Sequence, residues 1–91
     1  MIIISYDISD NKKRSRFSKY IMKFGHRLQY SVYEIENSER ILNNIVTDIN
    51  NKFLKIFNQS DSVYIFQLRA SCKVQKFGYA ANEDKTLIIV K

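Results

Sequence analysis

The chain has 91 residues, the size of one domain spanning residues 1–91, and its 45% apolar and 13% aromatic content excludes a disordered chain. Its net charge of +6 favours an anionic partner, most often nucleic acid. Cys72 is the only cysteine, so we expect a small buried residue, no intramolecular disulfide and a cytoplasmic protein. The opening apolar run is too short for a signal peptide or a membrane span, so no membrane partner is expected.

Residues 2–8 read Ile-Ile-Ile-Ser-Tyr-Asp-Ile and predict a strand that is buried on both faces and therefore central in its sheet. Asp7 lies at the far end of this strand. A carboxylate there must be paired, hydrated or bound to a metal, because burying an uncompensated charge is unfavourable. Two interpretations stay open for Asp7, a helix-capping role and a metal ligand. For Asp10 we favour the helix cap.

Residues 11–24 predict a helix that is closed by Gly25, with Phe17, Tyr20, Ile21 and Phe24 as its apolar stripe. Seven basic residues and no acidic one lie between residues 11 and 27. An exposed helix face usually mixes both signs of charge, so an all-basic face indicates contact with phosphates, and a solubilising face is the alternative. The four members of this face are Lys12, Arg16, Lys19 and Lys23.

The remaining segments alternate between strand and helix. We place His26 in a turn and predict that residues 27–36 form one long strand or two short ones. Ser38 is expected to cap a helix that runs to about residue 57. Residues 62–68 predict an interior strand, 74–79 a short strand and 86–90 a final apolar strand.

This order predicts an α+β fold, a ferredoxin-like sandwich in which two helices cover one face of a largely antiparallel sheet. The strand at about residues 86–90 is surplus to that fold. A free apolar edge strand promotes aggregation, so we expect it to pair across a two-fold homodimer.

The predicted dimer could also form a metal site that one chain alone forms poorly. One carboxylate is a weak site for Mg²⁺, which is typically held by one or two carboxylates with water and phosphate. Two copies of Asp7 near a dimer axis could hold one divalent ion, which would polarise a phosphate and activate water. The chain has no HExxH motif, no Cys/His ligand pattern, no glycine-rich phosphate loop and no Ser/His/Asp set.

Two motifs carry a family resemblance. Residues 6–10 read YDISD, and residues 29–34 read QYSVYE about two dozen positions later, with Arg14, Arg16, Gly25 and Arg27 between them. Together these closely resemble the CRISPR-associated protein two family, the small endoribonuclease-like proteins of CRISPR adaptation. The motif matches run over residues 2–34, and later elements fall in compatible places.

The resemblance implies a ferredoxin-like homodimer that docks with the CRISPR integrase, captures duplex DNA and takes part in spacer acquisition. Some family members are also described as nucleases that need Mg²⁺ or Mn²⁺ and act on single-stranded RNA or duplex DNA. Asp7 would then be the metal ligand and, with Tyr6, catalytic. The positions that match family residues around the cleft or the nucleic acid are Tyr6, Arg14, Arg16, Arg27 and Tyr33, the last being usually Phe in the family.

Arg14 and Arg16 are about 160° apart on a helix, so only Arg16 lies on the basic face. We expect Arg14 to turn toward Asp7 or Asp10, orienting a carboxylate or meeting a phosphate. Two alternatives to the adaptation protein remain: a stand-alone toxin-type ribonuclease of the same fold, and a non-catalytic basic RNA-binding module.

Overall fold

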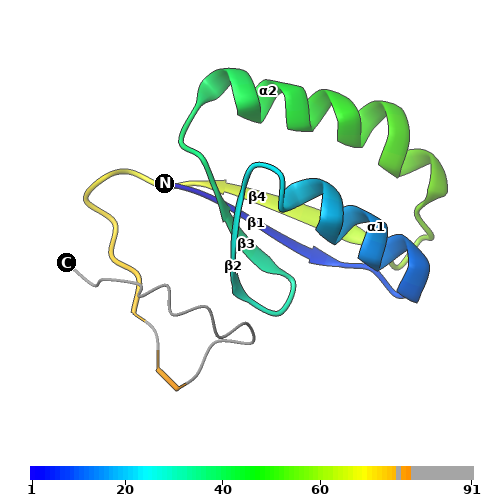
Figure 1. The fold of residues 1–91 in the computed structure, drawn as a ribbon, viewed down its shortest axis with the longest axis horizontal. Coiled ribbons are helices and arrows are strands. Elements are labelled where there is room, and N and C mark those ends of the chain that lie inside the picture. Colours follow the sequence, from blue (N-terminus) through cyan, green and yellow to red (C-terminus); the bar gives the residue numbers. More distant parts are fainter. Residues whose placement is uncertain (76, 79–91) are drawn as a thin grey trace.

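The computed structural model describes residues 1–75, 77 and 78 as four strands and two helices (Figure 1). Two short helical segments, η1 and η2, continue the second helix. In chain order the elements are β1 (Ile2–Asp7), α1 (Asn11–Ile21), β2 (Gly25–Gln29), β3 (Val32–Ile35), α2 (Glu39–Asp48), η1 (Ile49–Phe53), η2 (Leu54–Ile56) and β4 (Ser62–Gln67).

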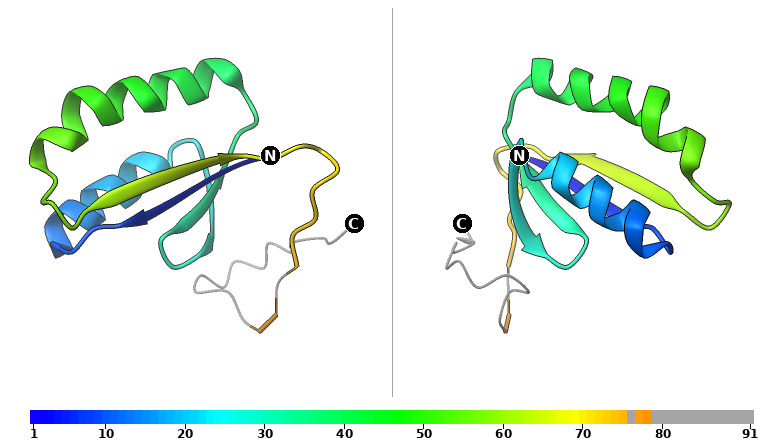
Figure 2. Two further views of the ribbon diagram at one scale, coloured as in Figure 1. Left: turned by 180° about the vertical axis from the view of Figure 1, so that it is seen from behind. Right: turned by 45° about the vertical axis from the view of Figure 1, so that its right-hand side comes forward.

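The four strands form one antiparallel sheet in the order β2-β3-β1-β4, so β1 is interior as its apolar sequence predicts. Ile4 lies between Tyr33 of β3 and Ile65 of β4. Both helices pack against the same face of this sheet (Figures 1 and 2). The predicted α+β, ferredoxin-like sandwich is confirmed within the described residues.

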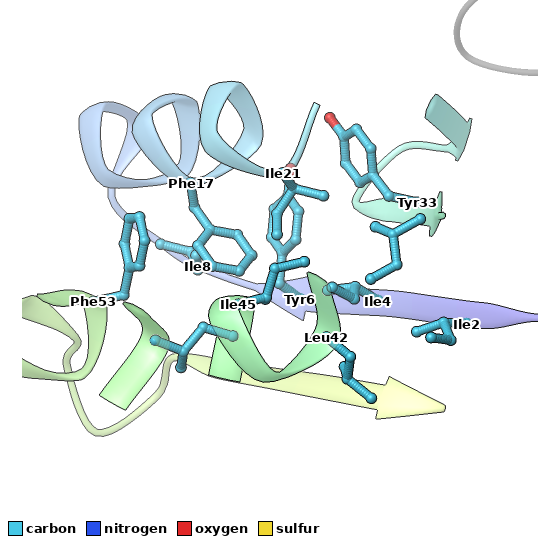
Figure 3. Close-up of a cluster of buried hydrophobic side chains, with 12 residues drawn as sticks. Ile2, Ile4, Tyr6, Ile8, Phe17, Ile21, Tyr33, Leu42, Ile45 and Phe53 are labelled. Atoms are coloured by element: carbon cyan, nitrogen blue, oxygen red, sulfur yellow. The ribbon is translucent and has the colours of Figure 1, made fainter. Parts of the chain in front are cut away.

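The core lies between the sheet and the two helices (Figure 3). Alternate residues of β1 and the residue that follows it point toward the helices, because successive side chains of a strand face opposite sides. The buried cluster takes its members from every layer: Ile2, Ile4, Tyr6, Ile8, Phe17, Ile21, Tyr33, Ile35, Leu42, Ile45, Ile49 and Phe53. The other face of β1 carries Ile3, Ser5 and Asp7.

Both helices begin at the side-chain caps that their sequences predict. The Asp10 carboxylate accepts from the amide of Lys13 at 2.9 Å, and the Ser38 hydroxyl accepts from the amide of Ile41 at 3.3 Å. Asp10 is therefore the cap of α1, and Asp7 is not. The second helix continues through η1 and η2 to Ile56, one residue short of its predicted end.

Residues 25–35 form a β-hairpin, which resolves the open choice in favour of two strands. Ser31 in its turn has a φ of 65°, in the left-handed region. Gly25 does not close α1 in that region; it opens β2, because α1 ends at Ile21. His26 lies in β2 opposite Glu34, with His26 Nε2 3.7 Å from Glu34 Oε1, so its placement in a turn was wrong.

Beyond β1, two expectations meet a different outcome. Within the described part of the chain β4 pairs only with β1 and lies at the edge of the sheet, so its prediction as an interior strand is not met there. Cys72 is exposed rather than buried.

The predicted strand at 86–90 lies outside the described residues, as do positions 76 and 79 of the predicted strand 74–79. No helix in the described part is both long and apolar enough to cross a bilayer.

The conformation at Gly25 generates a stability prediction. A Cβ placed on Gly25 would lie 2.0 Å from the carbonyl oxygen of Glu34 and 2.6 Å from Cα of Ile35, both of them backbone atoms. We expect Gly25→Ala to lower the free energy of unfolding by about 1–3 kcal/mol, because β3 must shift. Urea unfolding measures this, with Asn44→Ala on the exposed face of α2 as the control. An unchanged midpoint for Gly25→Ala would show that the hairpin adjusts freely.

Candidate nucleic-acid interface and strand-end carboxylate

Asp7 ends β1 on the face of the sheet that the helices leave open. It is exposed and lies opposite Ser62 of β4. Within the described residues its carboxylate has no hydrogen-bond or ion-pair partner. An exposed carboxylate with free lone pairs suits a hard cation such as Mg²⁺. The described residues contain no group of three or more His, Cys, Asp or Glu side chains that could hold a metal.

Arg14 does not orient either carboxylate as expected. Its Nη1 donates to the carbonyl oxygens of Ile8 at 2.9 Å and Ser9 at 3.3 Å, and its Nη2 donates to Asn11 Oδ1. The backbone turns between β1 and α1 with these carbonyls unpaired by strand or helix, and the guanidinium satisfies them. Arg14 therefore stabilises the loop that follows Asp7, with its remaining surface facing a cavity described below.

A second carboxylate, Asp61, also stabilises the loop between β1 and α1. Asp61 Oδ1 accepts from the amide of Ser9 at 3.0 Å and from its hydroxyl at 3.2 Å, while Oδ2 accepts from the amide of Asn58 at 2.8 Å. The hydrogen bonds from the Asn58 and Ser9 amides hold the pKa of Asp61 below its usual value. Asp61 thereby joins the turn before β4 to the loop after β1.

The predicted basic face is exposed along α1. Lys12, Arg16 and Lys19 lie on the helix, and Lys23 follows in the turn after it. Arg16, Lys19 and Lys23 line a hollow of about 460 Å³ together with Lys52 of η1. Lys52 was not foreseen as part of this surface. We call Lys12, Arg16, Lys19 and Lys23 the basic ridge.

Tyr33 and Arg27 form a polar cluster beside the core. The Tyr33 hydroxyl accepts from Arg27 Nε at 3.1 Å and Nη2 at 3.0 Å, and it shares a 2.5 Å hydrogen bond with Ser18 Oγ of α1. Figure 3 shows the hydroxyl of Tyr33 at the end of its ring that faces α1. Burial raises the pKa of Tyr33, but the hydrogen bonds from Ser18 and Arg27 outweigh it, so the pKa lies below its ordinary value.

Tyr6 is a core residue with its hydroxyl near the same cluster. It is 6% exposed, its ring meets Phe17 edge-on at 5.1 Å and stacks beside Tyr33 at 6.0 Å. Burial, followed by a hydrogen bond with Tyr33, raises the pKa of Tyr6 to about 12. Tyr6 and Asp7 are neighbours in sequence but face opposite sides of the sheet, so the structure does not bring these two candidate catalytic side chains together.

A cavity of about 290 Å³ opens where α1 meets the hairpin. We call it the hairpin cavity. Among the described residues no acidic side chain lines it, and three cations do: Arg14, Lys19 and Arg27. Hydroxyls complete its wall, from Tyr6, Ser15, Ser18, Tyr30 and Ser31.

Sequence reasoning missed Ser18, Lys52 and Asp61. Ser18 lies four residues after Arg14, on the same side of α1, and that spacing could have identified it. Lys52 and Asp61 come from segments far along the chain, and no local pattern links them to α1 or β1. Only the packing of η1 beside α1 and the pairing of β4 with β1 brings them to the site.

The fold and the site together define a class: a small ferredoxin-like α+β protein with a basic helix surface and a carboxylate at the end of its central strand. A family model described as "CRISPR associated protein Cas2" matches residues 1–76. The chain belongs to the Cas2 family, which confirms the resemblance drawn from its two motifs.

Curated relatives agree with this assignment. The chain is similar to CRISPR-associated endoribonuclease Cas2 4 of Rhodospirillum rubrum, with 28% identity over 83 residues, covering 91% of this chain and 64% of that protein. It is also similar to CRISPR-associated endoribonuclease Cas2 of Mycobacterium tuberculosis, with 29% identity over 77 residues and coverages of 85% and 65%. The chain thus spans somewhat less than two thirds of the length of these two relatives.

Solved structures show the same fold. Streptococcus pyogenes Cas2 at pH 6.5 superposes with a TM-score of 0.66 at 21% identity, covering 85% of this chain and 98% of that one. A hypothetical protein, TT1823 from Thermus thermophilus, superposes with a TM-score of 0.69 at 23% identity, with coverages of 85% and 88%.

The hydrogen bonds of Asp61 predict a pH-dependent stability. Because the pKa of Asp61 is lower in the folded chain, its contribution is full above its unfolded pKa of about 3.9 and is lost as the pH falls through the lowered value. We therefore expect Asp61→Asn to lower the melting temperature at pH 7 and the difference from the parent to disappear at the acid end. Thermal unfolding between pH 2 and pH 7 measures it.

Glu36→Gln, a change at an exposed carboxylate beside β3, is the control for this comparison. A melting difference for Asp61→Asn that stays constant across that pH range would contradict a role for the ionised carboxylate.

Proposed function

We propose that this protein is a CRISPR adaptation protein that acts as a homodimeric scaffold: with the CRISPR integrase it binds duplex DNA for spacer acquisition. We further propose a metal-dependent endonuclease activity, on single-stranded RNA or duplex DNA, centred on Asp7. Membership of the Cas2 family and the description of its relatives as endoribonucleases support the nuclease.

The observation that carries nucleic-acid binding is the basic ridge. Its four cations are exposed on one side of α1 and the following turn, and none has a carboxylate partner among the described residues. Like charges at helical spacing destabilise a free helix slightly, and phosphates relieve that repulsion. Such contacts hold the sugar–phosphate backbone without reading its sequence.

The proposed dimer uses the face of the sheet that the helices leave open. On β4 this face carries Tyr64, 62% exposed, and Phe66, 46% exposed, with their rings stacked at 6.1 Å. Tyr64 lies opposite Ser5 of β1, and Phe66 lies opposite Ile3. All four side chains are therefore on the same face of the sheet as Asp7. Covering these apolar side chains with a second copy removes them from water and brings a second Asp7 toward the first.

The metal proposal follows from that arrangement. Asp7 offers hard oxygen ligands and is free of other partners in the described part of the chain, which fits Mg²⁺ or Mn²⁺. A divalent ion held by Asp7 of each subunit would polarise a phosphate and lower the pKa of a bound water. Asp61 is not a member of this set, because Ser9 and Asn58 already occupy its oxygens.

A toxin-type ribonuclease of the same fold would share Asp7 but act without an integrase. A non-catalytic RNA-binding module would need the basic ridge and leave the unpaired Asp7 without a role. Purification of the tagged chain from its host separates these candidates, because only the adaptation protein should co-purify with an integrase.

Charge reversal on the basic ridge tests duplex binding. For Arg16→Glu/Lys19→Glu/Lys23→Glu we expect a large loss of affinity and a salt dependence that is weaker by about three ion equivalents per subunit, since each phosphate contact releases about 0.9 counterion. Fluorescence anisotropy with duplex DNA over a range of salt concentrations measures both quantities.

The matched control is Arg40→Glu/Lys55→Glu/Lys73→Glu, which changes the net charge equally at exposed positions elsewhere. Equal losses in the two triple variants would mean that net charge alone drives binding, and a salt-independent parent would remove the proposal.

Substitution of Asp7 tests the nuclease separately, because Asp7 and the basic ridge lie on opposite sides of the sheet. We expect Asp7→Ala to reduce Mg²⁺-dependent cleavage by more than about 100-fold, since loss of even an outer partner of a metal ligand lowers activity about 10- to 100-fold. Cleavage of labelled RNA and DNA, with and without chelator, measures this, and Glu36→Ala is the control. Equal cleavage by parent and Asp7→Ala would assign the activity to a contaminant.

A further inference from the structure

The hollow between α1 and η1 places charges of one sign around an apolar floor. Its cations come from both helical segments, and they are Arg16, Lys19, Lys23 and Lys52. Its floor is formed by Tyr20, Phe53 and Ile56. Among the described residues no acidic side chain lines it. We call this hollow of about 460 Å³ the helix hollow, and its volume lies within the 300–1,000 Å³ range of small-molecule sites.

The floor of the helix hollow is a packed aromatic surface. The Phe53 ring meets Phe17 edge-on at 4.9 Å and lies 5.1 Å from the Tyr20 ring. The Tyr20 hydroxyl donates to Asp48. Burial, followed by this hydrogen bond, raises the pKa of Tyr20, so the hydroxyl keeps its proton and continues to donate. A ring held in this way is a preformed surface on which a flat apolar group can stack.

The wall that carries Lys52 and Phe53 has an uncommon backbone geometry. The segment η1 is π-helical, and the amide of Leu54 donates to the carbonyl oxygen of Ile49, five residues earlier. Segments of this kind are rare and frequently occur at functional sites. This observation is independent of charge and falls on the same hollow.

The cations of the helix hollow are only partly compensated. Lys52 Nζ lies 3.8 Å from Asp48 Oδ1. The other three cations have no carboxylate partner among the described residues. Lys23 Nζ lies 5.9 Å from the centre of the Tyr20 ring, so a cation stands directly beside the apolar floor. A ligand that fills the hollow must therefore join a flat apolar group to several negative charges. The bases of a duplex are stacked inside it, so a duplex on the basic ridge offers phosphates but no such group.

We propose that the helix hollow is a binding site for a free nucleotide, with the base stacked on the floor and the phosphates held by the surrounding cations. The planar fork of Arg16 suits two phosphate oxygens at once, and the lysines add charge. Because the hollow shares Arg16, Lys19 and Lys23 with the basic ridge, a bound nucleotide would exclude duplex DNA from them. That exclusion rests on the proposed function, whereas nucleotide binding does not.

Calorimetric titration of the full chain tests nucleotide binding. ATP, tripolyphosphate and adenosine are compared in chelator, so that no divalent ion at Asp7 contributes. We expect ATP to bind at least about fivefold more tightly than tripolyphosphate, because the stacking of one base on aromatic side chains contributes that much or more. Adenosine should bind more weakly than ATP, since it lacks the phosphates. Equal affinities for ATP and tripolyphosphate would overturn the inference.

Lys52 separates the helix hollow from the basic ridge, because it lines the hollow and is not a member of the ridge. Lys52→Gln should weaken ATP binding about two- to fivefold, the effect of one exposed ion pair. The matched control is Lys55→Gln, the same change at an exposed position that does not line the hollow, and it should leave the affinity unchanged. Equal effects of the two lysine changes would contradict a site in the hollow.

The floor is tested by two changes at Tyr20. Tyr20→Phe keeps the ring and should bind ATP nearly as well as the parent. Tyr20→Leu removes the ring and should bind ATP at least about fivefold more weakly, while its affinity for tripolyphosphate stays the same. Equal losses for ATP and tripolyphosphate in Tyr20→Leu would show that stacking plays no part.

The position of the ligand and its competition with DNA are measured separately. In ¹⁵N NMR spectra, the amide signals that shift on adding ATP should cluster on α1 and η1, and shifts confined to other elements would overturn the inference. ATP should displace labelled duplex DNA, and adenosine should not. A chain that binds ATP in the hollow but no duplex would support the inference and refute duplex binding by the proposed scaffold. A chain that binds duplex but not ATP would do the opposite.

Discussion

The structure depends on β1 being held between two antiparallel partners with strict alternation of its side chains. Ile2, Ile4 and Tyr6 must face the helices to form the core. Because side chains alternate along a strand, Asp7 must then lie on the opposite face of the sheet, which the helices do not cover. A shift of one residue in register would bury the carboxylate and expose the isoleucines. The position of the candidate metal ligand is therefore fixed by the hydrophobic core of the sheet, without any partner contacting the carboxylate within the described residues.

The second constraint is the need to satisfy buried polar groups. A tyrosine in the middle of an apolar cluster is tolerated only if its hydroxyl is hydrogen-bonded. Tyr33 meets that condition with Arg27 and Ser18, and no buried side-chain polar atom of the described residues lacks a partner. The same bonds connect Ser18 of α1 to Tyr33 and Arg27 of the hairpin. One hydroxyl thus satisfies a buried polar group and links two elements at once.

Much of this could be predicted from the sequence where the signal is local. The Ile-Ile-Ile run identified a central strand, Asp10 and Ser38 identified helix starts, and the spacing of Lys12, Arg16 and Lys19 identified an exposed face. The predictions failed where a residue's role depends on backbone that is distant in the sequence. Glycine is a residue type that often ends a helix, so Gly25 was predicted to close α1. A glycine is required there because the backbone of β3 passes too close for a Cβ. Arg14 was expected to meet a carboxylate, yet unpaired carbonyls of the β1–α1 loop bind it. The local pattern predicts strand over residues 27–36, but it shows neither how closely β3 passes Gly25 nor which side chain meets the loop carbonyls.

The sheet separates the two surfaces to which functions are proposed. Its helix-covered side carries the basic ridge and the hairpin cavity, while its open side carries Asp7 with the exposed rings of Tyr64 and Phe66. If two copies meet through their open sides, both ridges face outward, and the paired carboxylates are enclosed between the sheets. A long duplex held on the ridges would then lie a full sheet thickness, plus a helix layer, away from Asp7. Backbone binding does not by itself deliver a phosphate to that carboxylate, so the proposed scaffold role and the proposed nuclease role depend on different surfaces of the chain.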